Sequence, residues 1–407
     1  KIYESSIETA VPIAIYSSAC LIVVFAFYIL IRYFKLSLGK GSIVLIRYLS
    51  NEQIKIYEYP LLLLGFFISL FSGIPVGAAE ISQCIGVGLA SEVYKRTDIK
   101  DNDSFDSISA ASFGAFFMSP LAAFSYSLES RKWKVTISYV IKSIVAISIA
   151  VGTTYLTKLL FNLQNHYLFR LAMFESFSWK SLWLYAFMGI VIAGVAFILN
   201  LSSLKLSRVF SNKKKYKDIA TVFTVIILIV ALVCTFFGLT YQYYTFSLAG
   251  YDGRRFILLF NKFKLGLLVG TVFLWGFYIL LIPHSNLVGG KMIPLMTVGA
   301  LIGLCFVWNG KDNHIINPDE YFMMITVGMF SLFGVVYKKP LTGFVLALTI
   351  SKWSVIPYQI LPLIFAIAPG YILLLVTKLP SWNECLGLSD SLSMAEQPEK
   401  DQKNLKK

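Results

Sequence analysis

Long apolar runs recur along the whole chain, and they constrain its fold more than any other feature of the sequence. Most are close to the length of about 20 residues that a helix needs to cross the hydrocarbon core of a bilayer. They lie near residues 10–31, 59–90, 106–128, 135–159, 182–204, 219–246, 256–283, 287–308, 318–336, 340–351 and 354–377. A β-barrel would instead show alternating strands of about ten residues. The sequence therefore predicts an all-α, polytopic membrane protein.

Composition and charge support this class. Of 407 residues, 57% are hydrophobic and only 14% are charged, which is too few charges for the surface of a soluble domain. The net charge of +14 comes largely from short basic loops beside the apolar runs, at 94–100, 131–134 and 205–217. Such loops face the cytoplasm. They predict a multi-pass cell-membrane protein and no nucleic-acid partner, and the Lys/Ile/Tyr/Asn-rich usage favours a bacterial plasma membrane.

Cysteine and histidine are too scattered to predict a metal site. The five cysteines contain no CxxC pair, and the three histidines lie far apart without an H-E-x-x-H motif. We therefore expect no metal and no cofactor. A membrane-embedded enzyme is a weak alternative, because such an enzyme needs a base beside an intramembrane cavity, and the histidines lie near the expected membrane edges.

One apolar run, 107–130, has basic residues on both sides. A single straight span would place these two basic loops on opposite faces of the membrane. Gly114 and Pro120 lie within the run, so the sequence predicts two elements that meet near Met118–Pro120 and return to the starting side. Such re-entrant backbone is tolerated where it is buried in protein or lines a watery cavity.

Two segments of the chain repeat, which predicts two related halves. Residues 113–133 match 333–353 without a gap at an offset of 220, and the shared positions include a glycine, a proline, a lysine and a tryptophan. A second pair, 73–86 and 290–303, matches at an offset of 217. We predict inverted copies, because paired interrupted helices are typical of a transport site at a repeat interface.

The matched breaks at Gly73 and Gly290 predict what such a site would hold. A helix that begins inside the membrane exposes unpaired N–H groups and the positive end of its dipole. Such an end binds an anion, and glycine lets the backbone approach it closely. The alternative is a kink filled by neighbouring helices.

These features resemble the CLC family of chloride channels and proton/chloride exchangers, over about residues 39–382. "FGAFFMSPLAAFSYSLES" (113–130) is similar to a Gly-rich helix followed by N-A-P-L-A-G and a glutamate pair, and "KKPLTG" (338–343) is similar to R-A-P-L-T-G. "GGKMIP" (289–294) resembles the anion signature G-x-F-x-P. "KLPSW" (378–382) resembles the stretch in which the family carries a pore tyrosine. By its spacing, "GIPVG" (73–77) takes the place of G-[KR]-E-G-P, and "GKGSI" (39–43) that of G-S-G-I-P.

The resemblance implies a set of site residues. Anion-binding positions fall at Lys40, Gly41, Gly73, Ile74, Val76, Gly290, Lys291, Met292 and Trp382. The gating glutamate is replaced by Pro75 and the inner proton-transfer glutamate by Ser130, while the preceding Glu129 is kept. Lys40 replaces the pore serine. Its ammonium either binds the anion directly or extends to the membrane edge.

The two lost carboxylates bear on mechanism. Neither Pro75 nor Ser130 can carry a proton near neutral pH, which favours passive anion transport, of chloride or a similar small anion. Three alternatives stay open. They are a proton/anion exchanger that uses Glu80 or Glu129 as a substitute acid, a transport-dead anion-binding scaffold, and, for Glu80 alone, a role that only satisfies the helix dipole.

The resemblance also implies an organisation of the chain. We expect a first half over 1–204, a basic cytoplasmic loop over 205–218, a second half over 219–386 and a disordered polar cytoplasmic tail over 387–407. The first long helix of the family is expected before residue 1. The resemblance further implies a homodimer with one pathway in each subunit.

Overall fold

The computed structural model describes residues 60, 63–67, 77–97, 102–131, 135–162, 179–209, 222–227, 229–230, 265–285, 287–312, 320–351 and 356–381. Seven of the predicted site residues, Lys40, Gly41, Gly73, Ile74, Pro75, Val76 and Trp382, lie outside these ranges. The tail 387–407 and residues 210–218 of the predicted basic loop also lie outside them.

Within these ranges the chain is helical, and no strand longer than an isolated bridge occurs among them. The α-helices are α4 (Ala79–Thr97), α5 (Asn102–Phe117), α6 (Pro120–Ser130), α7 (Ile137–Leu160), α8 (Leu182–Val209), α11 (Leu265–Leu281), α12 (Met292–Asp312), α13 (Tyr321–Val336), α14 (Pro340–Ile350) and α15 (Ile356–Val376). Two short 3-10 turns, η1 (Trp179–Ser181) and η2 (Ile282–His284), complete the set. The all-α prediction is confirmed.

Three described helices are long and apolar enough to cross a membrane: α7, the η1–α8 segment over Trp179–Leu206, and α15. Their positions agree with the predicted spans 135–159, 182–204 and 354–377. The helix α8 continues through Val209, so its last turns include the first residues of the predicted basic loop. The apolar stretches of the other helices are shorter, at 10–17 residues.

The predicted break in 107–130 is confirmed. The helix α5 ends at Phe117, Met118 has a positive φ of 50°, and α6 begins at Pro120. Ser119 is the N-cap, since its hydroxyl accepts the N–H of Ala122 at 3.2 Å. Pro120 suits the first helical position because its missing N–H would have had no helical partner.

The second half repeats this hairpin. The helix α13 ends at Val336, Lys338 has a positive φ of 54°, and α14 begins at Pro340. In both turns the residue before proline donates its N–H to the glycine five residues earlier: Ser119 to Gly114 at 3.0 Å and Lys339 to Gly334 at 2.8 Å. The 220-residue repeat is therefore present in backbone geometry as well as in sequence.

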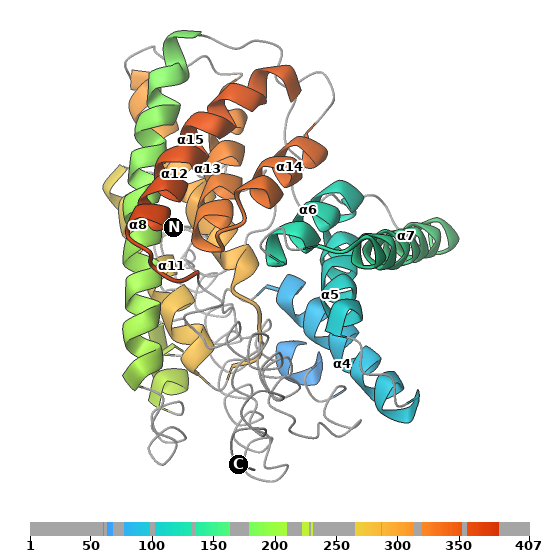
Figure 1. Cartoon of the computed structure of the whole chain (residues 1–407). Coiled ribbons are helices and arrows are strands. Elements are labelled where there is room, and N and C mark those ends of the chain that lie inside the picture. Colours follow the sequence, from blue (N-terminus) through green and yellow to red (C-terminus); the bar gives the residue numbers. More distant parts are fainter. Residues whose placement is uncertain are drawn as a thin grey trace, which may run out of the picture.

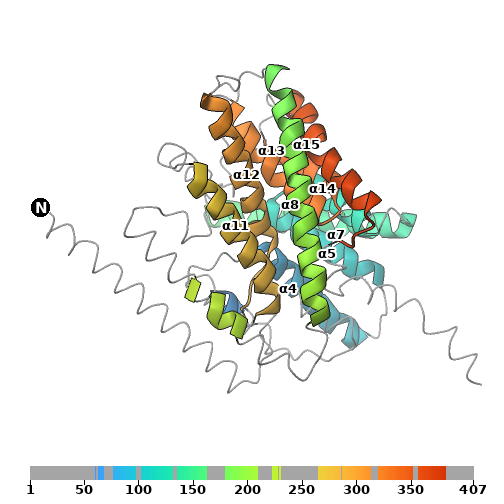
Figure 2. The ribbon, with the colours of Figure 1, turned by 90° about the vertical axis from the view of Figure 1, so that its left-hand side faces the viewer.

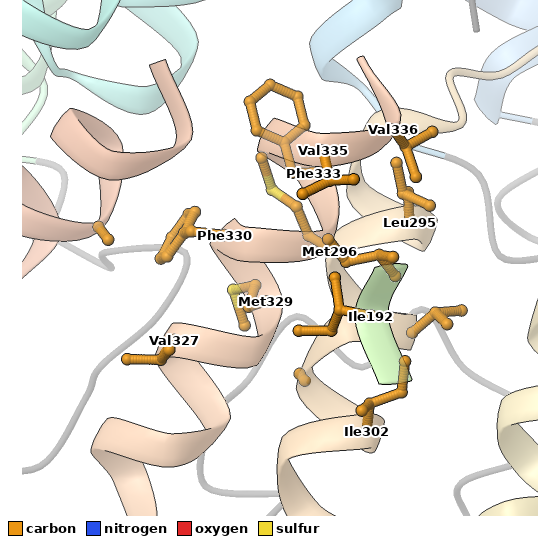
Figure 3. Packing of buried hydrophobic residues seen from close by; sticks show 14 of the residues in the cluster. Ile192, Leu295, Met296, Ile302, Val327, Met329, Phe330, Phe333, Val335 and Val336 are labelled. Atoms are coloured by element: carbon orange, nitrogen blue, oxygen red, sulfur yellow. The ribbon is translucent and has the colours of Figure 1, made fainter. Parts of the chain in front are cut away.

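The core lies where α12 and α13 pack against each other and against α8 (Figure 1). Figure 3 shows Ile192 of α8, Met296 of α12 and Phe330 of α13 among the interdigitating side chains. Glycines allow the two helices to approach closely, since a Cβ on Gly299 would lie 2.4 Å from the Gly328 carbonyl oxygen. Small residues at such contacts are typical of helix packing in membranes.

Figures 1 and 2 together show the arrangement around this core. The helix α8 runs the length of one side with α15 beside it, and α7 projects away on the opposite side. The hairpins α5–α6 and α13–α14 meet between them, through α6 and α14. The starts of α4 and α12 lie beneath this contact, so four helix ends converge in the interior.

Candidate anion site

The starts of α4 and α12 are joined by an antiparallel bridge. Gly77 donates its N–H to the Gly290 carbonyl at 2.7 Å, and Gly290 donates its N–H to the Gly77 carbonyl at 2.8 Å. Each helix begins two residues after its glycine. Glycine is required at both positions, because a Cβ on Gly290 would lie 2.8 Å from the Gly77 oxygen and one on Gly77 would lie 3.0 Å from Ile293 Cβ.

This bridge corrects the predicted register of the second repeat. The sequence match aligned Gly73 with Gly290 at an offset of 217. The structure pairs Gly77 with Gly290, an offset of 213, and places both two residues before a helix. Gly73 itself lies outside the described residues, so the break predicted there stays a prediction. The break predicted at Gly290 is present, since α12 begins two residues later.

Glu80 lies in the first turn of α4 and reaches across to the start of α12. Its Oε2 accepts the backbone N–H of Lys291 at 2.9 Å, and its Oε1 accepts the Tyr337 hydroxyl at 2.5 Å. Only 8% of Glu80 is exposed. The positive end of a helix dipole and an unpaired N–H are the groups that bind anions. A tethered carboxylate therefore occupies the place that the sequence analysis assigned to a free anion.

The predicted residues Gly290, Lys291 and Met292 all lie at this point. Lys291 and Met292 are 2% and 1% exposed, and Lys291 supplies the N–H that Glu80 accepts. The structure thus brings three predicted anion-binding residues together with Glu80, which the sequence analysis kept as a substitute acid. The partners of this site that fall at 40–41, 73–76 and 382 lie outside the described residues.

Glu129 has a different position. Its carboxylate accepts the N–H of Leu341 at 2.8 Å, the N–H of Thr342 at 2.8 Å and the Thr342 hydroxyl at 2.6 Å. These donors are the first turn of α14, so Glu129 caps that helix from the end of α6. At the repeat-equivalent contact, Thr349 of α14 meets Ser119 at the start of α6, with 2.8 Å between the hydroxyl oxygens. Three donors from the start of α14 therefore hold the Glu129 carboxylate in place.

Ser130, the predicted proton-path position, is exposed at the end of α6. Its hydroxyl donates to the Tyr126 carbonyl at 2.6 Å and accepts from the Lys339 ammonium at 2.5 Å. The same ammonium lies 3.0 Å from the centroid of the Tyr126 ring. Lys339 is only 7% exposed. The predicted proton-path position therefore faces a buried cation.

Sequence reasoning missed both Tyr337 and Lys339. They lie two residues apart in the α13–α14 turn, the first against Glu80 and the second against Ser130. A signal for Lys339 was available, because the pair Lys338–Lys339 interrupts an apolar run and ionisable residues within membranes are usually functional. No signal marked Tyr337, whose hydroxyl reaches Glu80 only through the fold.

Comparisons with known proteins agree with this architecture. A family model described as voltage gated chloride channel matches residues 22–374. A solved slow cyanobacterial Cl⁻/H⁺ antiporter superposes with a TM-score of 0.66 and 16% identity, covering 93% of this chain and 88% of its own.

Two further solved structures share the fold. A CLC-type fluoride/proton antiporter has a TM-score of 0.64 and 14% identity, with 91% and 89% coverage of this chain and its own. A eukaryotic CLC transporter has a TM-score of 0.63 and 15% identity, with 93% and 65% coverage. No curated protein matches the chain by sequence. At these identities the likeness shows the fold, and the family model shows the family.

Proposed function

The chain belongs to the voltage-gated chloride channel family, and from this premise we propose that it carries chloride or a similar small anion passively across a membrane, with the Glu80 carboxylate as the gate. The observation that carries the proposal is the position of Glu80. Its carboxylate accepts a helix-start N–H, the kind of group that binds a free anion, and the Tyr337 hydroxyl holds the carboxylate in that position. An anion can bind there only after Glu80 has left.

The surroundings of Ser130 support passive rather than proton-coupled transport. A serine hydroxyl holds no exchangeable charge, and the ammonium of Lys339 lies against it. A positive charge at this position attracts anions. Glu129, the other acid at this end of α6, is committed to the start of α14.

Proton/anion exchange is the second candidate, and the Glu80 position itself favours it. A carboxylate that competes with an anion for one site can take a proton when it is displaced, and one side chain would then link the two fluxes. The two candidates share the Glu80 gate and differ in whether protons move with each anion.

Reconstituted vesicles distinguish these candidates. Chloride efflux from proteoliposomes is measured together with internal pH, under an anion gradient and without a proton gradient. If transport is passive, chloride should leave the vesicles as soon as an ionophore carries a counter-ion to balance the charge. No uphill proton movement should accompany it. Uphill proton movement that is driven by chloride would establish exchange instead, and absence of chloride flux would favour a non-transporting scaffold.

Substitution of Glu80 tests the gate. E80A removes the tethered carboxylate, so we expect a higher chloride flux than in the wild type. Glu92 offers a matched control, because it lies on the same helix and pairs with Arg96 at 3.8 Å on the surface. E92A should transport at the wild-type rate. A flux from E80A that is equal to or below that of E92A would contradict the gate.

We also propose that two copies of the chain form a homodimer with a complete pathway in each. The proposal rests on the family to which the chain belongs. A monomeric mass both in mild detergent and in lipid nanodiscs would contradict it.

A further inference from the structure

A buried cation, Lys339, lies in the α13–α14 turn and contacts Ser130 rather than Glu80. We propose that Lys339 forms a second anion-binding position, separate from the start of α12, for a halide or another small monovalent anion. This inference rests on the proposed anion transport for its physiological meaning. The binding itself does not depend on Glu80.

The charge of Lys339 is not neutralised by a neighbouring ion pair. Among the residues that the structure describes, no carboxylate is ion-paired with its ammonium. The two carboxylates that act on it electrostatically are Glu129 and Asp106. Glu129 binds two N–H groups and the hydroxyl of Thr342 at the start of α14, and Asp106 pairs with Arg131 at 2.8 Å. A lysine that is 7% exposed in a membrane protein is costly and normally marks an ion pathway.

The local contacts leave room for an anion on this ammonium. An ammonium has three N–H donors and no acceptor. One donor is used by Ser130 Oγ at 2.5 Å, and the face of the Tyr126 ring lies 3.0 Å from the nitrogen. Ser130 cannot supply the missing negative charge, because its own proton goes to the Tyr126 carbonyl at 2.6 Å. At least one N–H is therefore available to a mobile anion.

Exposure indicates from which side an ion would arrive. Ser130 is exposed, whereas Tyr126 and Tyr337 are buried. Lys339 thus lies at the boundary between the exposed end of α6 and the interior around Glu80. An anion that comes past Ser130 would meet the ammonium first.

Counting bound bromide ions tests the proposal directly. Crystals or detergent-solubilised protein are saturated with bromide, and the ions are located by anomalous scattering and counted by isothermal titration calorimetry. In the wild type we expect one ion, in contact with Lys339, because Glu80 occupies the other position. K339M should bind none, E80A should bind two, and the E80A/K339M double variant should bind one.

Lys338 provides the matched control, since it is the adjacent lysine and does not contact Ser130. K338M should bind bromide as the wild type does, and K339R should retain the ion. If K339M keeps the wild-type number of ions at unchanged affinity, or if wild-type crystals show no bromide at Lys339, the proposal is overturned. The E80A arm is independent, because a failure to gain an ion there would contradict the Glu80 gate and leave the Lys339 site standing.

Discussion

Glu80 is held by two donors that come from distant parts of the chain, the N–H of Lys291 and the hydroxyl of Tyr337. A hydrogen bond to a charged group contributes about 1.5–3 kcal/mol. The strength of this pair sets how readily an anion replaces the carboxylate. The Tyr337 hydroxyl is the donor that substitution can remove without touching the backbone.

We predict that Y337F raises the apparent affinity for chloride by about tenfold or more. Removal of the hydroxyl weakens the hold on Glu80 by roughly 1.4 kcal/mol or more, and each 1.4 kcal/mol is a factor of ten. The measurement is the chloride concentration that gives half-maximal efflux from vesicles.

The control for this variant is Y185F. Tyr185 of α8 has a similar fully buried ring, and its hydroxyl makes no hydrogen bond among the described residues. Y185F should keep the wild-type affinity. If Y337F instead lowers the affinity, the hydroxyl serves the anion rather than the gate.

The residues of the site were only partly predictable. The helix start at Gly290, Lys291 and Met292 could be predicted, because these residues form a recognisable motif at the beginning of α12. The link between Glu80 and Tyr337 spans 257 positions in the sequence, and no local pattern encodes such a contact. Lys339 was predictable in principle from the cost of a cation in an apolar run.

At the scale of elements, the contact between α12 and α13 depends on glycines. A Cβ on Gly299 would lie 2.4 Å from the Gly328 oxygen, which is a backbone atom that cannot rotate away. We predict that G299A destabilises the fold by about 1–3 kcal/mol, the usual cost of overpacking. The midpoint of thermal unfolding in detergent, followed by tryptophan fluorescence, should fall by several degrees.

Gly194 of α8 and Gly276 of α11 are the matched controls, because nothing lies within 4 Å of a Cβ on either. G194A and G276A should unfold at the wild-type temperature or slightly above it, since alanine favours helix more than glycine does. Equal midpoints for G299A and these two variants would show that the helices can separate without cost.

The start of α14 depends on Glu129. We predict that E129A destabilises the protein by about 1–3 kcal/mol, because two N–H groups and a hydroxyl lose a charged acceptor. Unlike E80A, it should add no anion at the start of α12. A gain in chloride flux from E129A without loss of stability would assign a gating role to this residue after all.

At the scale of the whole molecule, the two hairpins were the most predictable part. Each hairpin needs a proline at the first position of its second helix and a glycine at the close contact. These are local requirements, so both hairpins have them in the sequence, at an offset of 220 residues. The register between Gly77 and Gly290 was not predictable in the same way, because it is fixed by contact between the halves. Regular spans such as α7 and α15 followed from hydropathy alone.

Inverted halves have a consequence for topology. We predict that both ends of the α5–α6 hairpin lie on the cytoplasmic side, and that both ends of the α13–α14 hairpin lie on the opposite side. The four reporters are single cysteines at Asn102 and Lys134 for the first hairpin, and at Asn313 and Lys352 for the second. All five native cysteines are replaced beforehand. Labelling uses a membrane-impermeant maleimide applied to intact cells and to inverted vesicles.

The physical reason is that each hairpin turns back inside the protein, so its two ends cannot face different aqueous phases. The basic residues at 131–134 then assign the first hairpin to the cytoplasm. A cysteine at Ile149 is the control, since this exposed position near the middle of α7 should face lipid and resist the reagent from both sides. Labelling of positions 102 and 134 from opposite sides would rule out the re-entrant hairpin, and labelling of all four positions from one side would rule out the inversion.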